Sequence, residues 1–283
     1  MTERVEGEGL AKGGFGKIMR RVGATAFLLV IAVGVYHSHK PLPEGLSYQG
    51  QPRAARGVEF LADLTYVDSH SGSRETGSSE RRFQQSIFDE VFAMISSAER
   101  FILIDMFLFN DFQGAVPERH RALSAELTRH LIAQKQKHPQ MQVLLITDPF
   151  NRLYGGLEPG HFIELEAAGI SVTYTRLTAL RDSNLIYSPI WRTFIGYWGN
   201  DIGSMLPNPV GQGRVSVRTY LSLLNFKANH RKVVIVDQGD DYIGLVTSAN
   251  PHDGSSAHSN VALRFSGPAV ADLLETEIAV LKM

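Results

Sequence analysis

The sequence NFKANHRKVVIVD occupies residues 225–237 and closes with an apolar run typical of a buried β-strand. Within it, His230, Lys232 and Asp237 follow the spacing H-x-K-x4-D. Residues two apart on a strand project from the same face, so His230 and Lys232 can address one phosphate together. Asp237 lies an odd number of positions after Lys232. We therefore expect Asp237 to face the other way, or to lie past the strand end and shape the following turn.

A second strand is expected directly after this one. The sequence YIGLVTSAN (residues 242–250) follows turn residues 238–241. Ser248 and Asn250 are again two apart, and they offer a hydroxyl and an amide to the same phosphate oxygens. A neutral imidazole can attack phosphorus while an ammonium group stabilises charge on the non-bridging oxygens, and neither step needs a metal ion. The pattern therefore predicts phosphodiester chemistry with no metal and no cofactor.

The segments around the motif alternate between helical and strand-like patterns. Helices are expected over residues 83–98, 123–137, 161–168 and 269–283, and strands over residues 101–109, 141–148 and 170–177. A polar loop rich in glycine and serine is expected over Ser69–Glu80. Apolar strands that alternate with helices predict an α/β fold, with a mixed, largely parallel sheet flanked by helices.

The amino terminus has the pattern of a membrane-targeting segment. Lys12, Lys17, Arg20 and Arg21 precede an uncharged stretch, Val22–Tyr36, whose apolar residues occupy every face of a helix. This pattern fits a signal anchor, or a signal peptide cleaved near the small residues 32–34, which would give a secreted protein. Because positive charge favours the cytoplasmic side, we expect a membrane-anchored protein with an extracytoplasmic catalytic domain.

The expected organisation of the chain follows from these segments. It consists of a cytoplasmic basic tail (residues 1–21), a transmembrane signal anchor (22–36), a linker that leads into the domain (37–82), and one domain that carries the motif (83–283).

Composition narrows the class of function. The chain has no cysteine, which excludes thiolate catalysis, cysteine-ligated zinc and disulfides. Its net charge of -1 gives no global attraction to a polyanion. Residues 181–232, however, carry seven Lys and Arg against two Asp, a local balance of +5. Lipid headgroups and nucleic-acid backbones would both be attracted, and the expected anchor favours headgroups.

Three segments together resemble the phospholipase D superfamily, in particular its bacterial phospholipase and cardiolipin-synthase-like branch: HRKVVIVD, TSAN and HSNVALRFSGPAV. The resemblance runs from about Phe83 to the last residue. It implies that His230 is a nucleophile that forms a phosphohistidine, with Lys232, Ser248 and Asn250 binding the phosphoryl group and Asp237 completing the motif. His258 or Asn260 would orient His230.

Three features depart from the pattern of this superfamily. Asn250 lies further from Asp237 than is usual, and Thr247 stands where a glycine is common. The motif also occurs once, although the chemistry of the superfamily uses two histidines, one of which protonates the leaving alcohol. A second half-site would come from a homodimer mate or from a missing carboxyl-terminal half.

The resemblance and the anchor together predict a phosphodiesterase or phosphatidyltransferase that acts on glycerophospholipids at a membrane. Nucleic acid is not the expected partner. Two alternatives stay open: an exported endonuclease of the same superfamily, and a non-catalytic half-site that binds phosphate.

Overall fold

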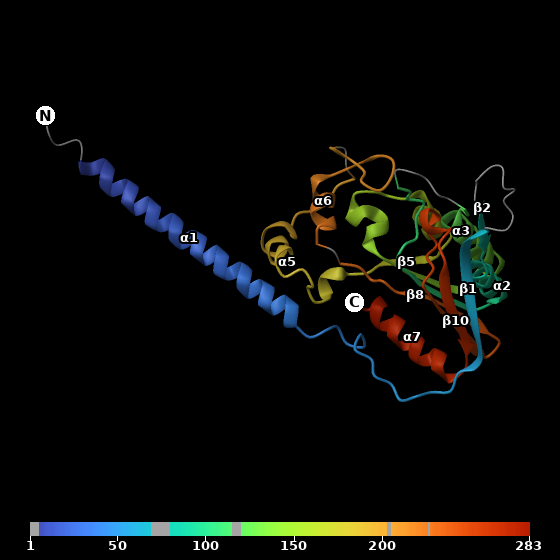
Figure 1. Cartoon of the computed structure of the whole chain (residues 1–283). Helices are drawn as coiled ribbons and strands as arrows, with labels where there is room; N and C mark the ends of the chain where they lie inside the picture. The colour runs from blue at the N-terminus through green and yellow to red at the C-terminus, as the bar shows by residue number, and fades with distance from the viewer. Residues whose placement is uncertain (1–5, 69–79, 115–119, 203–204, 226) are drawn as a thin grey trace.

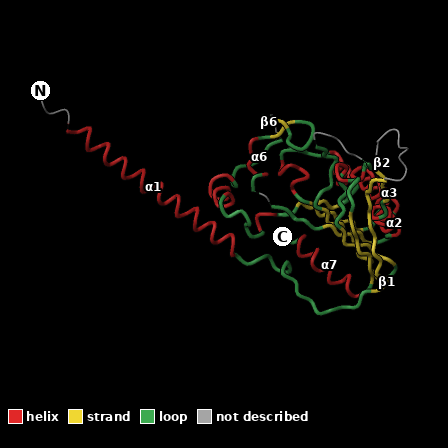
Figure 2. The backbone as a smooth tube through the Cα atoms, viewed as in Figure 1, coloured by secondary structure: helices red, strands yellow, loops and turns green. Residues whose placement is uncertain are grey.

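The computed structural model describes residues 6–68, 80–114, 120–202, 205–225 and 227–283. The polar loop expected over Ser69–Glu80 lies, except for Glu80, outside the described residues. Within the described part of the chain, eight strands form one sheet in the order β2-β1-β10-β9-β8-β3-β4-β5, and β6 and β7 form a separate pair (Figure 2). The strands are β1 Arg56–Asp68, β2 Glu80–Gln84, β3 Phe101–Met106, β4 Gln142–Thr147, β5 Ser171–Tyr174, β6 Leu206–Pro207, β7 Arg214–Val215, β8 Lys232–Gln238, β9 Asp241–Thr247 and β10 Asn260–Ser266.

The helices fall where apolar residues recur at helical spacing. They are α1 Glu6–His39, α2 Ile87–Ser97, α3 Leu123–Lys137, α4 Gly160–Ala167, α5 Tyr187–Ile190, α6 Val217–Leu223 and α7 Pro268–Leu281, with shorter helical turns η1 Pro149–Gly155, η2 Leu177–Ala179, η3 Trp191–Ile195 and η4 Asp253–Ser255. The expected helix over 123–137 agrees with α3 at both ends.

The sheet is mixed, as expected, but it is not largely parallel. Among the described strands of this sheet, only β3 with β4 and β4 with β5 pair in parallel, whereas the other five pairs of the sheet are antiparallel. The expectation of a largely parallel sheet was therefore wrong. Helical crossovers, α3 and α4, join the parallel strands, while a tight turn joins β8 to β9 and forces them antiparallel.

The sheet also begins earlier in the chain than residue 83. β1 lies within the stretch expected to be a linker, and it pairs along most of its length with β10 and β2. One face of β1 is exposed, so its sequence lacks the continuous apolar run by which the central strands were found.

Helices cover both faces of the sheet (Figure 1). α2, α3 and α4 pack on one face, in a core that includes Val91, Leu127 and Leu165, and α7 packs on the other through Val270 and Val280. β8 is buried on both faces, as a central strand should be. Because β8 runs antiparallel to β3, its amino-terminal end lies beside the carboxyl ends of β3 and β4. His230 stands at that end.

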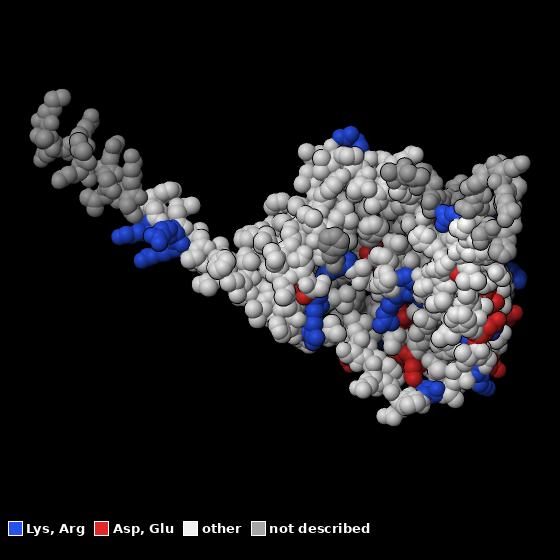
Figure 3. Space-filling model, viewed as in Figure 1, with Lys and Arg blue, Asp and Glu red and all other residues white. Residues whose placement is uncertain are grey.

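α1 extends away from the rest of the structure (Figure 1). Its stretch Phe15–His39 is long and apolar enough to cross a membrane, with 25 residues, a mean hydropathy of 1.8 and 6% of the tested window buried. At 1.5 Å per residue it spans about 37 Å, more than the ~30 Å of a hydrocarbon core. Lys and Arg gather on the amino-terminal side of this stretch (Figure 3). The expected anchor over Val22–Tyr36 lies inside this helix.

Candidate active site

His230 and Lys232 meet at the amino-terminal end of β8. The Lys232 ammonium lies 3.4 Å from each ring nitrogen of His230 and donates to the His230 backbone oxygen at 3.1 Å. Lys232 is 5% exposed, whereas His230 is open to solvent. The expectation that alternation on a strand would bring these two side chains together therefore agrees with the structure. A phosphate that approaches from solvent would reach the imidazole first, with the ammonium behind it.

The environment favours a neutral imidazole. Partial desolvation and the positive charge of Lys232 both lower the pKa of His230 below its usual value. Burial also lowers the pKa of Lys232, although the carboxylate of Asp105 opposes this effect. Phe107, which follows β3, contributes an apolar wall, since its ring centroid lies 4.8 Å from that of His230 and 5.3 Å from the Lys232 ammonium. A neutral imidazole is the form that can attack phosphorus.

Asn229, directly before His230 in the chain, is held by two buried carboxyl groups. Its backbone N–H donates to Asp148 at 2.7 Å, and its side-chain amide donates to both oxygens of Asp105 at 2.9 Å. Asp105 lies within β3, and Asp148 directly follows β4. Three neighbouring strand ends thus fix the backbone from which the His230 side chain projects.

Burial dominates the ionisation of these carboxyl groups. It raises the pKa of Asp148 to about 6, although hydrogen bonds from Phe150 and Asn229 oppose the shift. Burial and the neighbouring Glu277 raise the pKa of Asp105 to about 8. Glu277 belongs to α7 and accepts a hydrogen bond from Arg231 at 2.8 Å. The residue between His230 and Lys232 therefore ties the motif to the helix on the opposite face of the sheet.

Asp237 lies at the far end of β8, away from His230 and Lys232. Its carboxylate accepts hydrogen bonds from three successive backbone N–H groups, those of Glu99, Arg100 and Phe101, at 2.8 to 3.1 Å. Burial by itself would raise the pKa of Asp237, but these bonds outweigh it and hold the pKa below its usual value. The carboxylate thus secures the start of β3. The expectation that Asp237 would shape the turn after β8 was wrong, because its hydrogen-bond donors lie at residues 99–101.

Ser248 and Asn250 are placed differently from each other. The hydroxyl of Ser248 bonds to the Asn260 side chain and to the backbone N–H of Val261, both at 3.0 Å. The Asn250 side-chain oxygen accepts from the backbone N–H of Leu108, next to Phe107, at 3.0 Å. Within the described residues, no hydrogen bond joins either side chain to His230 or Lys232. Asn250 borders the site through the segment after β3 that carries Phe107 and Leu108, whereas Ser248 is engaged with β10.

The two residues expected to orient His230 bind elsewhere. The Asn260 amide donates to the His258 backbone oxygen at 3.2 Å, and its side-chain oxygen contacts Ser248. His258 is exposed, and nothing described links its ring to His230. Nearby, Asp253 accepts from the backbone and hydroxyl of Ser124 and so holds the start of α3. No group of three or more His, Asp or Glu among the described residues is placed to hold a metal ion.

Three residues at the site were missed in the sequence: Phe107, Asp148 and Asn229. Asn229 and Asp148 lie 81 positions apart, so no local pattern relates them. One signal was present, since Asp148 ends the apolar run of β4 just as Asp105 interrupts that of β3. A carboxyl group at a buried strand end is a reason to look for a partner there.

Comparison with known proteins adds information about the fold. No family model and no curated protein match the sequence. Among solved structures, 35 chains match. Nuc from Salmonella typhimurium, described as a phospholipase D family member, is 14% identical, with 78% of this chain and 92% of that chain covered and a TM-score of 0.37.

Two further structures show the same level of likeness. NucT from Helicobacter pylori is 12% identical over 78% of this chain and 94% of that chain, with a TM-score of 0.37. The polyphosphate kinase from Porphyromonas gingivalis is 9% identical over 78% of this chain and 26% of that chain, with a TM-score of 0.34. At these identities the likeness concerns the fold alone.

Proposed function

We propose that this protein is a phosphodiesterase of the phospholipase D type that acts on glycerophospholipids. A ring nitrogen of His230 attacks phosphorus, the bond from phosphorus to the headgroup oxygen breaks, and the departing alcohol takes a proton from a second histidine. Water or another alcohol then attacks the phosphohistidine, gives its proton back to that second histidine, and releases His230. The product is phosphatidic acid when water attacks and a new phospholipid when an alcohol attacks.

The contact between His230 and Lys232 carries this proposal. A nucleophile needs a free electron pair, and the lowered pKa of His230 supplies a neutral ring near pH 7. Charge that develops on the phosphoryl oxygens needs a fixed counter-charge, and the buried Lys232 ammonium, held by the His230 backbone oxygen, can provide one without reorganisation.

The membrane-compatible helix favours a lipid substrate. A domain that follows α1 directly would stay within reach of a bilayer. The positive charge of residues 181–232 is weaker in effect than the sequence count suggests, because at least three of its seven Lys and Arg side chains pair with carboxylates inside the structure. Arg192 and Lys227 pair with Asp182, and Arg231 pairs with Glu277. The charge available to bind a nucleic-acid backbone is correspondingly reduced.

We propose further that the second histidine comes from a second half-site, which docks on an exposed apolar face of the sheet. Cross-strand pairing aligns Phe60, Leu263 and Val246 on this face. The side chains that form the apolar sheet face are 41 to 65% exposed: Phe60, Leu64, Tyr66, Val246, Val261 and Leu263. Ser248, two residues beyond Val246, stands on the same face at the end nearest to Arg231 of the motif. Contiguous apolar surface of this kind is typical of an interface.

The substrate prediction is tested on the full chain in phosphatidylcholine vesicles with ethanol as acceptor. We expect release of choline and formation of phosphatidylethanol, undiminished by EDTA, because Lys232 supplies the charge that a metal would otherwise supply. A single-stranded oligonucleotide, tested in parallel, should remain intact. Cleavage of the oligonucleotide without lipid turnover would contradict the lipid assignment, and activity restored only by added metal would contradict the mechanism.

The apolar sheet face is tested by charge. Leu263→Asp should lower the mass of the detergent-solubilised assembly, measured by light scattering, and abolish turnover with it, because a buried aspartate without a partner opposes docking. Val67→Asp is the matched control, since Val67 is 53% exposed on the other face of β1. Full activity of a monomeric Leu263→Asp protein would show that one half-site suffices.

A further inference from the structure

One segment of the surface is unusually apolar. Over residues 185–198, here the aromatic segment, six large apolar side chains are 41 to 83% exposed: Leu185, Ile186, Ile190, Phe194, Tyr197 and Trp198. The segment contains α5 and η3, and the molecule is mostly white around α5 in Figure 3. Soluble surfaces rarely gather so many large apolar groups in so short a stretch, so a partner is expected to cover them.

The aromatic segment packs against the apolar helix. α5 lies beside the carboxyl-terminal end of α1 (Figure 1), and the approach is close at Gly34, where a Cβ would lie 2.8 Å from Cγ of Pro189. Gly34 is buried, whereas Val35 and Tyr36 beside it are exposed. α1 thus presents one narrow stripe to the aromatic segment and leaves its other faces open. If α1 spans a bilayer, whatever packs on Gly34 lies near the depth of Gly34.

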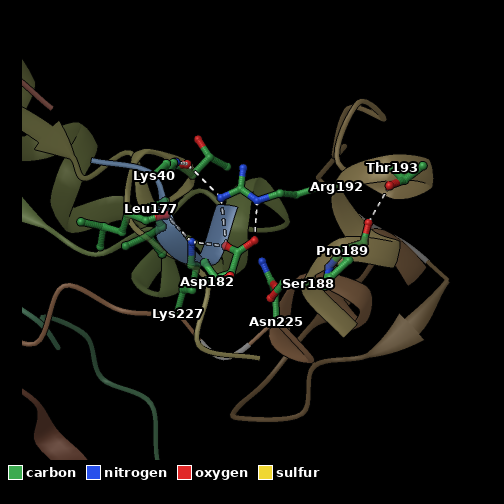
Figure 4. A network of polar contacts seen from close by, with 12 residues as sticks. Lys40, Leu177, Asp182, Ser188, Pro189, Arg192, Thr193, Asn225 and Lys227 are labelled. Atoms are coloured by element: carbon green, nitrogen blue, oxygen red, sulfur yellow. Dashed lines mark hydrogen bonds and ion pairs between the residues drawn. The ribbon is translucent and has the colours of Figure 1, made fainter. Parts of the chain in front are cut away.

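Asp182 links the aromatic segment to the end of α1 (Figure 4). Its backbone N–H donates to the His37 oxygen at 3.0 Å, and its carboxylate, 1% exposed, pairs with Arg192 at 2.7 Å and Lys227 at 2.6 Å. Burial opposes ionisation of Asp182, but hydrogen bonds from these two cations outweigh it and lower its pKa. The aromatic segment is therefore joined to the end of α1 through Asp182, by an ion pair from Arg192 and a backbone hydrogen bond to His37.

Contacts around Lys40 add to the link between the end of α1 and the residues that precede the aromatic segment. The Lys40 ammonium donates to the Thr178 oxygen at 2.8 Å, and Arg181 donates to the Lys40 oxygen at 2.7 Å. Lys227 lies three residues before His230 in the chain. Asp182 thus connects three parts of the chain: its backbone N–H binds the end of α1, and its carboxylate binds the aromatic segment and the loop that leads into the motif. Their relative positions are therefore set together.

We propose that the aromatic segment is a second membrane contact, which enters the lipid interface beside α1 and holds the His230 site at a fixed orientation to the bilayer. This inference rests on the proposed membrane placement of α1. Exposed tryptophan and tyrosine next to apolar side chains are the composition that a bilayer interface accepts. Continuity with α1 points to lipid as the occupant, because the exposed faces of both elements meet along one contact.

The two tryptophans provide the test. Trp198 is 61% exposed and Trp191 is 8% exposed, so Trp191→Phe leaves an indole on the surface of the aromatic segment and Trp198→Phe leaves one inside the protein. The full chain is placed in phosphatidylcholine vesicles whose acyl chains are brominated near the headgroup. We expect Trp198 to lose most of its fluorescence to brominated lipid and to be shielded from aqueous acrylamide, with Trp191 affected little by either quencher.

Flotation of the same vesicles distinguishes the membrane placement of α1 from the lipid contact of the aromatic segment. A chain that does not float with vesicles would refute the membrane placement of α1. A chain that floats while acrylamide quenches Trp198 would refute only the aromatic contact, and so would a Trp198 shielded from both quenchers, which would indicate a protein partner.

A functional readout completes the test. Ile186→Asp should float normally through α1 and keep its turnover of a water-soluble phosphodiester, while its turnover of vesicle lipid falls about 10-fold, because misorientation of the site removes productive encounters. Leu224→Asp is the matched control, since Leu224 is 51% exposed and lies outside the aromatic segment. Equal turnover of vesicle lipid by Ile186→Asp and the unchanged chain would overturn the proposal.

Discussion

Replacement of His230 by alanine should abolish turnover, with a loss of at least about 10⁴-fold, the scale seen when a covalent nucleophile is removed. A labelled phospholipid, quenched in base, should leave a base-stable, acid-labile phosphoryl group on His230 in the unchanged chain and none in the variant. Lys232→Ala should slow formation of this adduct by at least ~100-fold, because one preorganised charge is lost. His120→Ala is the control, since His120 is exposed and lies outside the motif.

The pH dependence gives a second readout of the same contact. The neutral ring attacks, so the rate of adduct formation should rise with pH through the pKa of His230, which lies below its ordinary value of 6.5. Lys232 contributes to that lowering, and Lys232→Ala should therefore move the inflection to higher pH as well as reduce the rate. An adduct that persists in His230→Ala would place the nucleophile elsewhere.

Asp237→Ala should reduce the free energy of unfolding by about 3 kcal/mol, because three backbone N–H groups would lose their acceptor in a buried place. Asp237→Asn should cost less, about 1 kcal/mol, since an amide oxygen can still accept. Chemical denaturation of the full chain in detergent measures both. Turnover per folded molecule should stay close to that of the unchanged protein, which distinguishes this effect from that of His230.

The pH dependence of this stabilisation has a definite sign. The folded pKa of Asp237 is depressed below 3.8, so its contribution is present above that value and is lost as pH falls through the folded pKa. The difference in stability between the unchanged chain and Asp237→Ala should therefore shrink in acid. An Asp237→Ala protein that unfolds normally but no longer turns over substrate would instead make Asp237 part of the chemistry.

The central strands and long helices could be predicted because their signals are local. α3 agrees with the expected range at both ends, and β8 reads as a continuous apolar run because it is covered on both faces. The direction of β8 relative to β3 could not be predicted from the sequence. Helices between β3, β4 and β5 correctly indicated parallel pairing, but β8 enters beside β3 after more than a hundred residues, and nothing local fixes its direction.

The site was predictable to the extent that it depends on alternation along one strand. His230 and Lys232 follow from their spacing, and so does the separation of Asp237 from them. The carboxyl groups that hold Asn229, and the ion pairs of Asp182 with Arg192 and Lys227, depend on contacts between distant segments. β1 was missed for a related reason, because its apolar residues alternate with polar ones and half of them face outward.

The position of Asp237 shows that the three residues of the motif, His230, Lys232 and Asp237, do not share one role. His230 and Lys232 lie at one end of β8, where the proposed reaction with phosphorus takes place. Asp237 lies at the other end, where its carboxylate joins β8 to the start of β3. We therefore expect substitutions at positions 230 and 232 to affect activity, and substitutions at position 237 to affect folding. On the proposed mechanism, a chain with other residues in place of His230 and Lys232 would lose its reaction and keep its shape, yet it would still need a hydrogen-bond acceptor at position 237. The terminal aspartate of the motif contributes to the architecture, whereas the proposed activity depends on the histidine and the lysine.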